Sequence, residues 1–434
     1  MPMKRISWPS IWAILALALA SLPSTASAQE ADSAPVTILR AAHLLDVREG
    51  VLLDDVAVVI EGGEIRSVTP AGELPPGAEV IDLGDVTLLP GLIDAHTHLL
   101  HQYRRENGND DANRILEIVE MSGADRALLG ASIAREMVEA GFTTVRDLGN
   151  SGTSNDVALR DAIAQGWVIG PRMYVSTRAL APIGGQFGTI EEVALPLVER
   201  EYVQIEGPEE AREAVRRAIY DGADWIKVIV NSGPMILAPE EMEAIVDEAH
   251  RAGVRVAAHA TKGDGPAMIA ARAGVDTIEH GYTISDDVLK VMKDNGITLV
   301  PTDSETAEHH QARIRRAMAA GVPIAIGSDL YYKVEGQTRG EEAAQIYPRY
   351  VTAGMSNLEV VRSATLVPGQ LLDPRGRIGA VEPGAWADII AVRGNPLEDI
   401  GALERVEFVM KDGAVIVNRM SASSPSAAGG TAVD

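Results

Sequence analysis

The sequence predicts an α/β fold: a (β/α)8 TIM-type barrel with a small β-sandwich domain built from the N- and C-terminal segments. Two observations predict it. Apolar strand-like runs that end in polar residues alternate with longer helical patterns over roughly 280 residues. Segments with strand patterns alone lie on both sides of that region. The 434-residue chain contains 46% apolar and 23% charged residues, an ordinary globular composition.

The N-terminal segment has the pattern of an export signal. Lys4 and Arg5 precede an apolar run over residues 11–22, and Ala26-Ser27-Ala28 forms a small-x-small cleavage pattern. The apolar run is shorter than the roughly 20 residues that a membrane-spanning helix needs. We therefore expect residues 1–28 to be a cleaved signal peptide and the mature chain to be periplasmic or secreted.

The composition excludes several classes of function. The net charge is −24 and the sequence shows no local basic patch, so we expect no binding to nucleic acid, and none to membranes after signal cleavage. The chain has no cysteine, which excludes disulfides, iron–sulfur clusters, Cys-ligated zinc and thiol catalysis. Metal ligands would have to come from the nine histidines and the carboxylates.

Residues 29–87 and 376–420 are expected to form the small β domain. Their strand-length runs are Val36–Arg40, Val56–Ile60, Glu64–Val68, Ala387–Val392 and Val406–Val417. Neither segment is long enough to make two packed sheet layers alone, so we expect one shared sandwich. The Ser-, Ala- and Gly-rich residues 421–434 are expected to be a disordered tail.

Residues 88–375 carry the alternating pattern of the barrel. The expected strands are Leu88–His98, Thr143–Asp147, Met173–Thr177, Trp225–Val230, Arg255–His259, Thr277–His280, Thr298–Pro301 and Ile324–Asp329. Segments between them, such as Pro239–Ala252, begin with acidic residues and repeat apolar residues at helical spacing. An open doubly wound sheet is the main alternative, but the sequence lacks a Gly-rich dinucleotide fingerprint.

Candidate metal ligands lie at the ends of these strands. His96 and His98 are two residues apart, so both side chains face the same side of a strand. At the C-terminal end of a barrel strand, that side faces the mouth, where barrel enzymes build their sites.

Further chemical groups lie in or at the end of separate expected strands: Lys227, His259, His280 and Asp329. A buried, unpaired lysine is costly, so Lys227 must be neutralised, paired or modified. Four imidazoles, one carboxylate and a lysine carbamate would suit two borderline divalent cations such as zinc.

These motifs together resemble the amidohydrolase superfamily. The resemblance is carried by Pro90–His98, Lys227, His259, His280, Gly327–Asp329 and Gly379–Val392. It implies that His96, His98 and Asp329 bind one metal ion. It further implies that His259 and His280 bind a second ion and that N6-carboxylated Lys227 bridges the two. The implied cofactors are two divalent ions, expected to be Zn²⁺, with Asp329 as the catalytic acid–base group.

Within the superfamily, the chain resembles exported metal-dependent dipeptidases and prolidase-like enzymes at Asp147–Gly149, Lys227–Gly233 and Asp247–Gly253. Such relatives cleave aminoacyl-proline or aminoacyl-basic dipeptides, and some cleave the aryl amide of ochratoxin A. The resemblance implies a binuclear-metal amide hydrolase that cleaves dipeptides or N-acyl or aryl amino-acid amides through metal-activated hydroxide.

Two loops depart from the pattern of these relatives. Gly184-Gly185-Gln186 stands where they commonly carry Gly-Gly-His, and His259-Ala260-Thr261-Lys262 stands where they often carry His-Ala-His-Gly. Both departures fall on expected mouth loops, so they bear on substrate choice more than on metal binding.

Other functions stay open at this stage. A cyclic amide or lactone hydrolase of the same superfamily would share every ligand. A deaminase is disfavoured because no Glu closely follows His259, and a non-catalytic periplasmic metal- or ligand-binding protein is disfavoured because Asp329 is present. The oligomeric state is also open, and a homo-oligomer is compatible with the sequence.

Several residues are candidate substrate contacts by loop position alone: Tyr103, Gln186, Asn231, Ser232, Tyr282 and Lys333. His101, just past the His-x-His motif, could line the mouth, but we favour a solvated loop residue. Asp94 and Asp147 are expected to make strand-end hydrogen bonds or to support the metal ligands.

Overall fold

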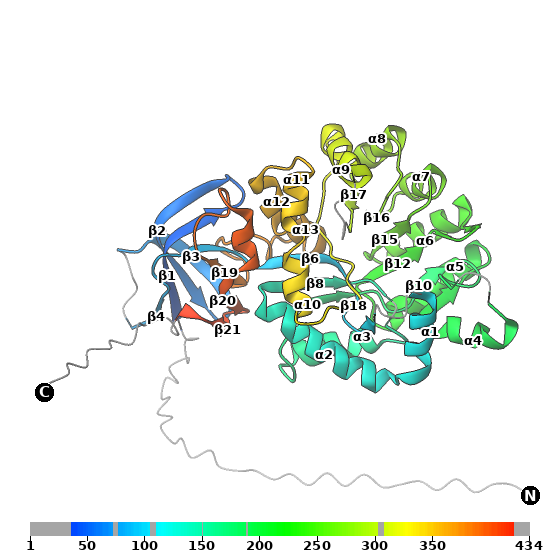
Figure 1. Cartoon of the computed structure of the whole chain (residues 1–434), viewed down its shortest axis with the longest axis horizontal. Coiled ribbons are helices and arrows are strands. Elements are labelled where there is room, and N and C mark those ends of the chain that lie inside the picture. Colours follow the sequence, from blue (N-terminus) through cyan, green and yellow to red (C-terminus); the bar gives the residue numbers. More distant parts are fainter. Residues whose placement is uncertain are drawn as a thin grey trace, which may run out of the picture. The chain divides into compact units, whose positions relative to one another are not determined.

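The computed structural model describes residues 36–72, 77–104, 110–149, 151–187, 190–302 and 308–420. The expected signal peptide (residues 1–28) and the expected tail (residues 421–434) lie outside the described residues. The described chain is a mixed α/β structure with parallel sheets (Figure 1). None of its described helices is both long enough and apolar enough to cross a bilayer.

Strands from both ends of the chain form one eight-stranded sheet in the described residues (Figure 1). They are β1 (Val36–Asp46), β2 (Val51–Glu61), β3 (Glu64–Pro70), β4 (Glu79–Asp82), β5 (Thr87–Pro90), β19 (Ile389–Val392), β20 (Val406–Lys411) and β21 (Ala414–Asn418). Their order is β21-β20-β19-β5-β1-β2-β3, and β4 pairs with β1. The antiparallel pair β5–β19 joins the two ends of the chain. Apolar side chains such as Leu39, Val58 and Phe408 form a core on this sheet.

Two sheets between these segments consist of parallel strands. A three-stranded sheet contains β6 (Leu92–Thr97), β8 (Phe142–Asp147) and β9 (Arg172–Val175). A six-stranded sheet contains, in order, β11 (Tyr202–Gln204), β10 (Ala179–Ala181), β12 (Trp225–Ile229), β15 (Arg255–Ala260), β16 (Thr277–His280) and β17 (Thr298–Val300). Every residue of β6, β8 and β12 is buried, as expected of parallel strands that are covered on both faces.

Backbone hydrogen bonds link the two parallel sheets. Asp224 N, before β12, donates to Val175 O of β9 at 2.8 Å. Ala325 N donates to Leu299 O of β17 at 3.0 Å, and Ala95 N of β6 donates to Ile326 O at 3.0 Å. Two short pairs lie beside the strand ends: β7 (Tyr103–Arg104) with β18 (Tyr332–Lys333), and β13 (Asn231–Ser232) with β14 (Met235–Ile236).

Helices follow most of the parallel strands. They are α1 (Asp110–Glu120), α2 (Gly123–Glu139), α3 (Asn155–Ala164), α4 (Leu195–Glu201), α5 (Pro208–Tyr220), α6 (Pro239–Arg251), α7 (Asp264–Ala273), α8 (Asp286–Asn295), α9 (Glu308–Ala320), α10 (Arg339–Ala344), α11 (Tyr347–Thr352), α12 (Asn357–Ser363) and α13 (Leu366–Leu372). Helices α5 to α8 lie outside β12, β15, β16 and β17 (Figure 1). The predicted helix after β12 is α6, where Pro239 occupies the first turn and Glu241 accepts from Ala238 N at 2.7 Å.

Two predicted strands differ from those observed. The run Leu88–His98 is divided at Gly91, and its first part joins the eight-stranded sheet as β5. Gly91 is needed because a Cβ there would lie 2.0 Å from Thr143 Oγ1. The run Ile324–Asp329 is not a regular strand, since Ile324 makes an isolated bridge to β17 and the chain then bonds to β6.

Candidate metal centre

The predicted metal ligands all line one cavity with a volume of about 170 Å³: His96, His98, Lys227, His259, His280 and Asp329. Lys227, His259 and His280 lie on three different parallel strands, β12, β15 and β16. His96 lies on β6 and His98 directly follows it, and Asp329 lies in the irregular segment after Ile324. The alternation of a strand explains the pair, since Thr97 between them turns away and contacts Asp147.

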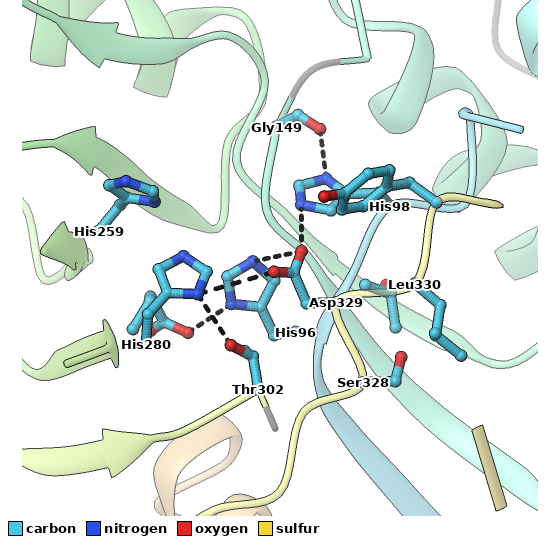
Figure 2. A network of polar contacts seen from close by, with 12 residues as sticks. His96, His98, Gly149, His259, His280, Thr302, Ser328, Asp329 and Leu330 are labelled. Atoms are coloured by element: carbon cyan, nitrogen blue, oxygen red, sulfur yellow. Dashed lines mark hydrogen bonds and ion pairs between the residues drawn. The ribbon is translucent and has the colours of Figure 1, made fainter. Parts of the chain in front are cut away.

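Three imidazoles surround the Asp329 carboxylate (Figure 2). Asp329 Oδ1 lies 3.1 Å from His98 Nε2 and 3.6 Å from His96 Nε2, and Oδ2 lies 3.6 Å from His280 Nδ1. The ligand atoms of His96, His280 and Asp329 all lie within 4.8 Å of one another.

The outer nitrogens of two rings are held by acceptors. His98 Nδ1 donates to Gly149 O at 3.0 Å, and His96 Nδ1 lies 2.7 Å from Glu279 Oε2. In a neutral ring this leaves the lone pair on Nε2, facing the carboxylate. His98 Nε2 and Asp329 Oδ1 lie 3.1 Å apart, and a cation between these two acceptors would stabilise their approach. The nitrogen and oxygen donors present therefore fit a divalent metal ion such as zinc.

The electrostatics favour the metal-binding forms of these groups. Removal from bulk water, followed by the charge of Lys227, holds the pKa of His96 and of His259 well below the usual range. Removal from water, followed by the neighbouring His259, does the same to the pKa of His280. The rings are therefore neutral at neutral pH, as metal binding requires. For Asp329, burial acts to raise the pKa. The charge of His96 and the contacts with the other neighbouring groups have a larger combined effect, so the pKa of Asp329 is lowered.

Lys227 is buried in β12 with 3% of its surface exposed. Its Nζ lies 3.4 Å from His96 Nε2. Burial lowers the pKa of Lys227 to about 8, although Glu279 and Asp329 act to raise it. In a fraction of the molecules, Lys227 is therefore an uncharged amine at neutral pH, which is the form that reacts as a nucleophile.

His259 lies at the edge of this group. Its ring centroid is 4.5 Å from that of His280, and its Nε2 is 3.4 Å from both Gln186 Nε2 and Thr261 Oγ1. Gln186, which stands where the relatives commonly carry a histidine, therefore places its side-chain amide next to His259.

Two of the candidate ligands and a residue that contacts one of them have a strained backbone. His280, Thr302 and Asp329 have φ values of 65°, 55° and 51°, in the left-handed region that favours glycine. Such residues cost about 1–3 kcal/mol each and persist where their surroundings fix them. Asp329 N donates to His96 O at 2.8 Å, and His280 Nδ1 lies 2.8 Å from Thr302 Oγ1.

Two supporting residues were missed by the sequence analysis. Glu279 and Arg146 are fully buried, and Arg146 donates to Glu279 Oε1 at 2.9 Å and to Ala95 O at 2.6 Å. Arg146 balances the charge of the carboxylate that orients His96. Their signal in the sequence was a charged residue inside a short buried strand, β8 for Arg146 and β16 for Glu279.

Asp94 and Asp147 support the ligand-bearing segments through backbone hydrogen bonds. Asp94 Oδ1 accepts from His96 N at 3.1 Å and from Ser328 N at 2.9 Å, so it ties β6 to the segment that carries Asp329. Burial raises the pKa of Asp94 to about 6. Asp147 Oδ2 accepts from Leu99 N at 2.7 Å and fixes the turn after His98.

Three of the candidate substrate contacts line the cavity: Tyr103, Gln186 and Tyr282. The other three are not among its described lining residues. Asn231 is buried and bonds to Thr261, Ser232 lies in the β13–β14 pair, and Lys333 is exposed on β18.

The expectation for His101 was wrong. This residue is 1% exposed and lines the cavity beside His98, with ring centroids 6.3 Å apart. Its Nδ1 contacts Glu117 of α1, and its Nε2 lies 2.8 Å from the Arg126 guanidinium of α2. These partners are distant in sequence, so a reading of the local loop could not find them.

The chain is similar in sequence to known hydrolases. The sequence profile of the amidohydrolase family matches residues 87–416. Ochratoxinase from Aspergillus niger is 29% identical over 433 residues, covering 87% of this chain and 85% of its own length. Imidazolonepropionase from Geobacillus kaustophilus is 25% identical over 407 residues, with 85% and 91% covered.

The fold is similar to that of solved structures of such hydrolases. A prolidase complexed with N-methylphosphonate-L-proline is 30% identical, with a TM-score of 0.77 over 88% of this chain and 100% of that one. A Xaa-Pro dipeptidase with methionine bound in its active site is 29% identical, with a TM-score of 0.77 over 88% and 99%. The chain belongs to the amidohydrolase family and is a hydrolase that acts on carbon–nitrogen bonds.

Proposed function

We propose that this protein is a binuclear metal-dependent hydrolase of dipeptides and of N-acyl or aryl amino-acid amides, ochratoxin A among them. One observation carries the proposal: neutral imidazoles, the Asp329 carboxylate and the uncommonly acidic Lys227 line a single cavity. The similarity to proteins named prolidase, Xaa-Pro dipeptidase and ochratoxinase supports this substrate class.

In this proposal, His96, His98 and Asp329 hold one ion. His259 and His280 hold the other, and carboxylated Lys227 bridges them. The neutral Nζ of Lys227 adds to the carbon of carbon dioxide and releases a proton, which gives a carbamate. The carbamate replaces a buried positive charge, which would repel two cations, with a negative one. Nitrogen and oxygen ligands in this number suit Zn²⁺.

Two cations bound here would supply Lewis acidity toward a water molecule and toward the amide carbonyl. Asp329, which is ionised at neutral pH, accepts the proton of the attacking water at Oδ2. Its Oδ1 stays between His96 and His98. Asp329 then donates the proton to the leaving amide nitrogen, so one group acts as base and then as acid.

The proposal extends to the architecture. The hydrogen bonds that link the parallel sheets on both sides support their closure into a (β/α)8 barrel. We further propose that residues 88–375 form the barrel domain, apart from Leu88–Pro90, which β5 places in the eight-stranded sheet. Residues 29–87 and 376–420 then form the small β domain as a sandwich, and the chain is exported with cleavage after Ala28.

A substrate panel tests the proposed function. Zinc-loaded mature protein is incubated with aminoacyl-proline, aminoacyl-arginine and aminoacyl-phenylalanine dipeptides, ochratoxin A, a lactone and a cyclic amide, and products are quantified by mass spectrometry. Turnover of a dipeptide or of ochratoxin A is expected. Turnover confined to the lactone or the cyclic amide would overturn the proposal in favour of the alternative hydrolase.

A further inference from the structure

Arg313 is a buried cation beside the candidate metal centre. It lies on α9, a helix that supplies none of the candidate ligands, and it is 1% exposed. Its Nη1 donates to the backbone carbonyl of His280, the last residue of β16. Its Nη2 donates at 3.4 Å to the carbonyl of Pro301, which directly follows β17. One side chain therefore connects the ends of two neighbouring parallel strands.

The backbone at these strand ends needs such a restraint. The φ value of His280 is 65°, and that of Thr302, the residue after Pro301, is 55°. Both values lie in the left-handed region, which residues with a Cβ rarely adopt, and such conformations persist where the surroundings fix them. Arg313 binds the carbonyl of the strained His280 itself, so it holds the chain at the point from which the imidazole projects.

The ring of His280 is oriented by a short chain of hydrogen bonds. The Thr302 hydroxyl donates to Pro301 O at 2.8 Å, so its oxygen accepts from His280 Nδ1, which also lies 2.8 Å away (Figure 2). The Tyr282 hydroxyl is farther from the same nitrogen, at 3.4 Å. A neutral imidazole with its proton on Nδ1 has its lone pair on Nε2. The Pro301 carbonyl that ends this chain is the one that Arg313 also binds.

The charge of Arg313 also favours the form of His280 that binds metal. Burial is the largest cause that lowers the pKa of His280, and the charge of Arg313 acts in the same direction. The guanidinium carbon lies 5.3 Å from the centroid of the Tyr282 ring, a cation–π distance. Tyr282 lines the cavity, and its ring centroid is 5.5 Å from that of His280. Arg313 therefore contacts the ligand and its aromatic neighbour from the side of α9.

We propose that Arg313 is a positioning residue for His280 and that it directs Nε2 of this ring toward the second metal ion. The inference rests on the proposed function, in which His259 and His280 hold that ion. The ring centroids of these two histidines lie 4.5 Å apart, and His259 lies on the opposite side of the His280 ring from Thr302 (Figure 2). The nitrogen that does not contact Thr302 is therefore the one available to the shared ion.

The ligands of the first ion have a separate support. Asp94 Oδ1 accepts from His96 N and from Ser328 N, which ties β6 to the segment that carries the carboxylate ligand. These contacts do not involve α9. Loss of the Arg313 guanidinium should therefore weaken one metal position and leave the other unchanged.

The test measures the affinity of each metal position for zinc in the wild type, Arg313→Met and Arg313→Lys. Metal-free protein in bicarbonate is titrated with zinc against a chromophoric chelator, and circular dichroism checks the fold. The methionine keeps an apolar stem without donors, and the lysine keeps the charge without the forked donors. Arg315→Met is the matched control, because Arg315 is exposed on the same helix and pairs with Glu308. Thr302→Val, which removes the hydroxyl with little change of shape, probes the hydrogen-bond chain independently.

In Arg313→Met the affinity for the second ion is expected to fall roughly 10- to 100-fold, the usual effect of removing a group that orients a metal ligand. Arg313→Lys should lose less, because an ammonium can still bind one of the two carbonyls. The affinity for the first ion should stay as in the wild type. Thr302→Val should show the same selective loss, and Arg315→Met should show none. Dipeptide hydrolysis by Arg313→Met should recover as zinc saturates the second position, since Arg313 takes no part in breaking the amide bond.

Wild-type affinity for the second ion in Arg313→Met, or an equal loss at both positions, would overturn the inference, because a residue needed only for folding affects both ions alike. If Arg313→Met does not fold, Arg313→Lys decides in the same way. Failure of both variants to fold would assign Arg313 to stability alone and also overturn the inference. Failure of the proposed function looks different, because the wild type would then bind fewer than two zinc ions or hydrolyse no dipeptide.

Discussion

His98 Nε2 lies 3.1 Å from Asp329 Oδ1, while Nδ1 of the same ring donates to the Gly149 carbonyl. In a neutral ring both facing atoms are acceptors, so their approach is unfavourable until a cation lies between them. The fold brings these two residues together from segments that are far apart in the sequence, and a metal ion would stabilise their approach.

Removal of the metal ions should destabilise the protein for this reason. An excess of chelator is expected to lower the melting temperature, and added Zn²⁺ should restore it. A free ligand concentration 100 times the dissociation constant corresponds to about 2.7 kcal/mol of stabilisation. Scanning calorimetry with and without chelator is the measurement. The same melting temperature in both conditions would contradict a metal site at His98 and Asp329.

Asp329→Asn should abolish most of the activity, because an amide cannot take up and return the proton. The expected fall in kcat is roughly 10²- to 10⁴-fold. Asp247→Asn serves as the control, since Asp247 is exposed on α6 and contacts Arg212 and Arg251. Steady-state kinetics are read together with metal content. An Asp329→Asn protein that turns over substrate at nearly the wild-type rate would rule out this acid–base role.

Gly327→Ala should displace a metal ligand. A Cβ at Gly327 would lie 2.5 Å from His96 Cβ and 2.8 Å from His96 N. Relief of this overlap requires a backbone shift that we expect to cost about 1–3 kcal/mol of unfolding free energy and to weaken metal binding. Gly265→Ala in α7 is the control, because a Cβ there meets nothing within 4 Å. Denaturant unfolding that gives equal stability for both variants would argue against the close approach of these two segments.

The stability of the metal-free protein should fall in mild acid. The histidines His96, His259 and His280 have pKa values well below 6.5 in the folded state, so the unfolded chain binds protons that the folded chain does not. As the pH falls below 6.5, each histidine therefore costs up to about 1.4 kcal/mol per pH unit. Asp94, with its pKa raised to about 6, acts in the opposite direction because the folded state takes up its proton below that pH.

Melting temperatures measured in chelator between about pH 7 and about pH 5 check this balance. The wild type should lose stability as the pH falls, and Asp94→Asn should lose it more steeply, because the opposing carboxyl is gone. A flat profile, or an equal slope in the two proteins, would show that these groups do not titrate as their burial implies.

The sequence was sufficient to predict the residues that meet at the site. His96, His259, His280 and Asp329 stand out as polar groups at the ends of apolar runs, and Lys227 stands out as a charged residue inside one. All of them line one cavity, since parallel strands bring their ends to one edge. The sequence also predicted helix α6, because Pro239 and the acidic residues after it mark its first turn.

The parts that could not be predicted depend on contacts between distant segments. Arg146 donates a hydrogen bond to Glu279, which lies 133 residues further along the chain. His101 contacts Glu117 of α1 and Arg126 of α2. The division of the first predicted barrel strand at Gly91 depends on the close approach of Thr143. Asn231 of β13 bonds to Thr261 and is not among the described lining residues of the cavity, and no local pattern in the sequence predicts this.

The metal content of the wild type and of Lys227→Ala tests the binuclear site most directly. Each protein is reconstituted with zinc and bicarbonate and analysed for metal, with Lys290→Ala as the control because Lys290 is exposed on α8. We expect about two zinc ions per chain in the wild type and in Lys290→Ala. Lys227→Ala should lose both metal and activity, and short carboxylic acids should partly restore them. A wild type that holds one ion, or a Lys227→Ala protein that keeps two ions and normal turnover, would contradict the binuclear site.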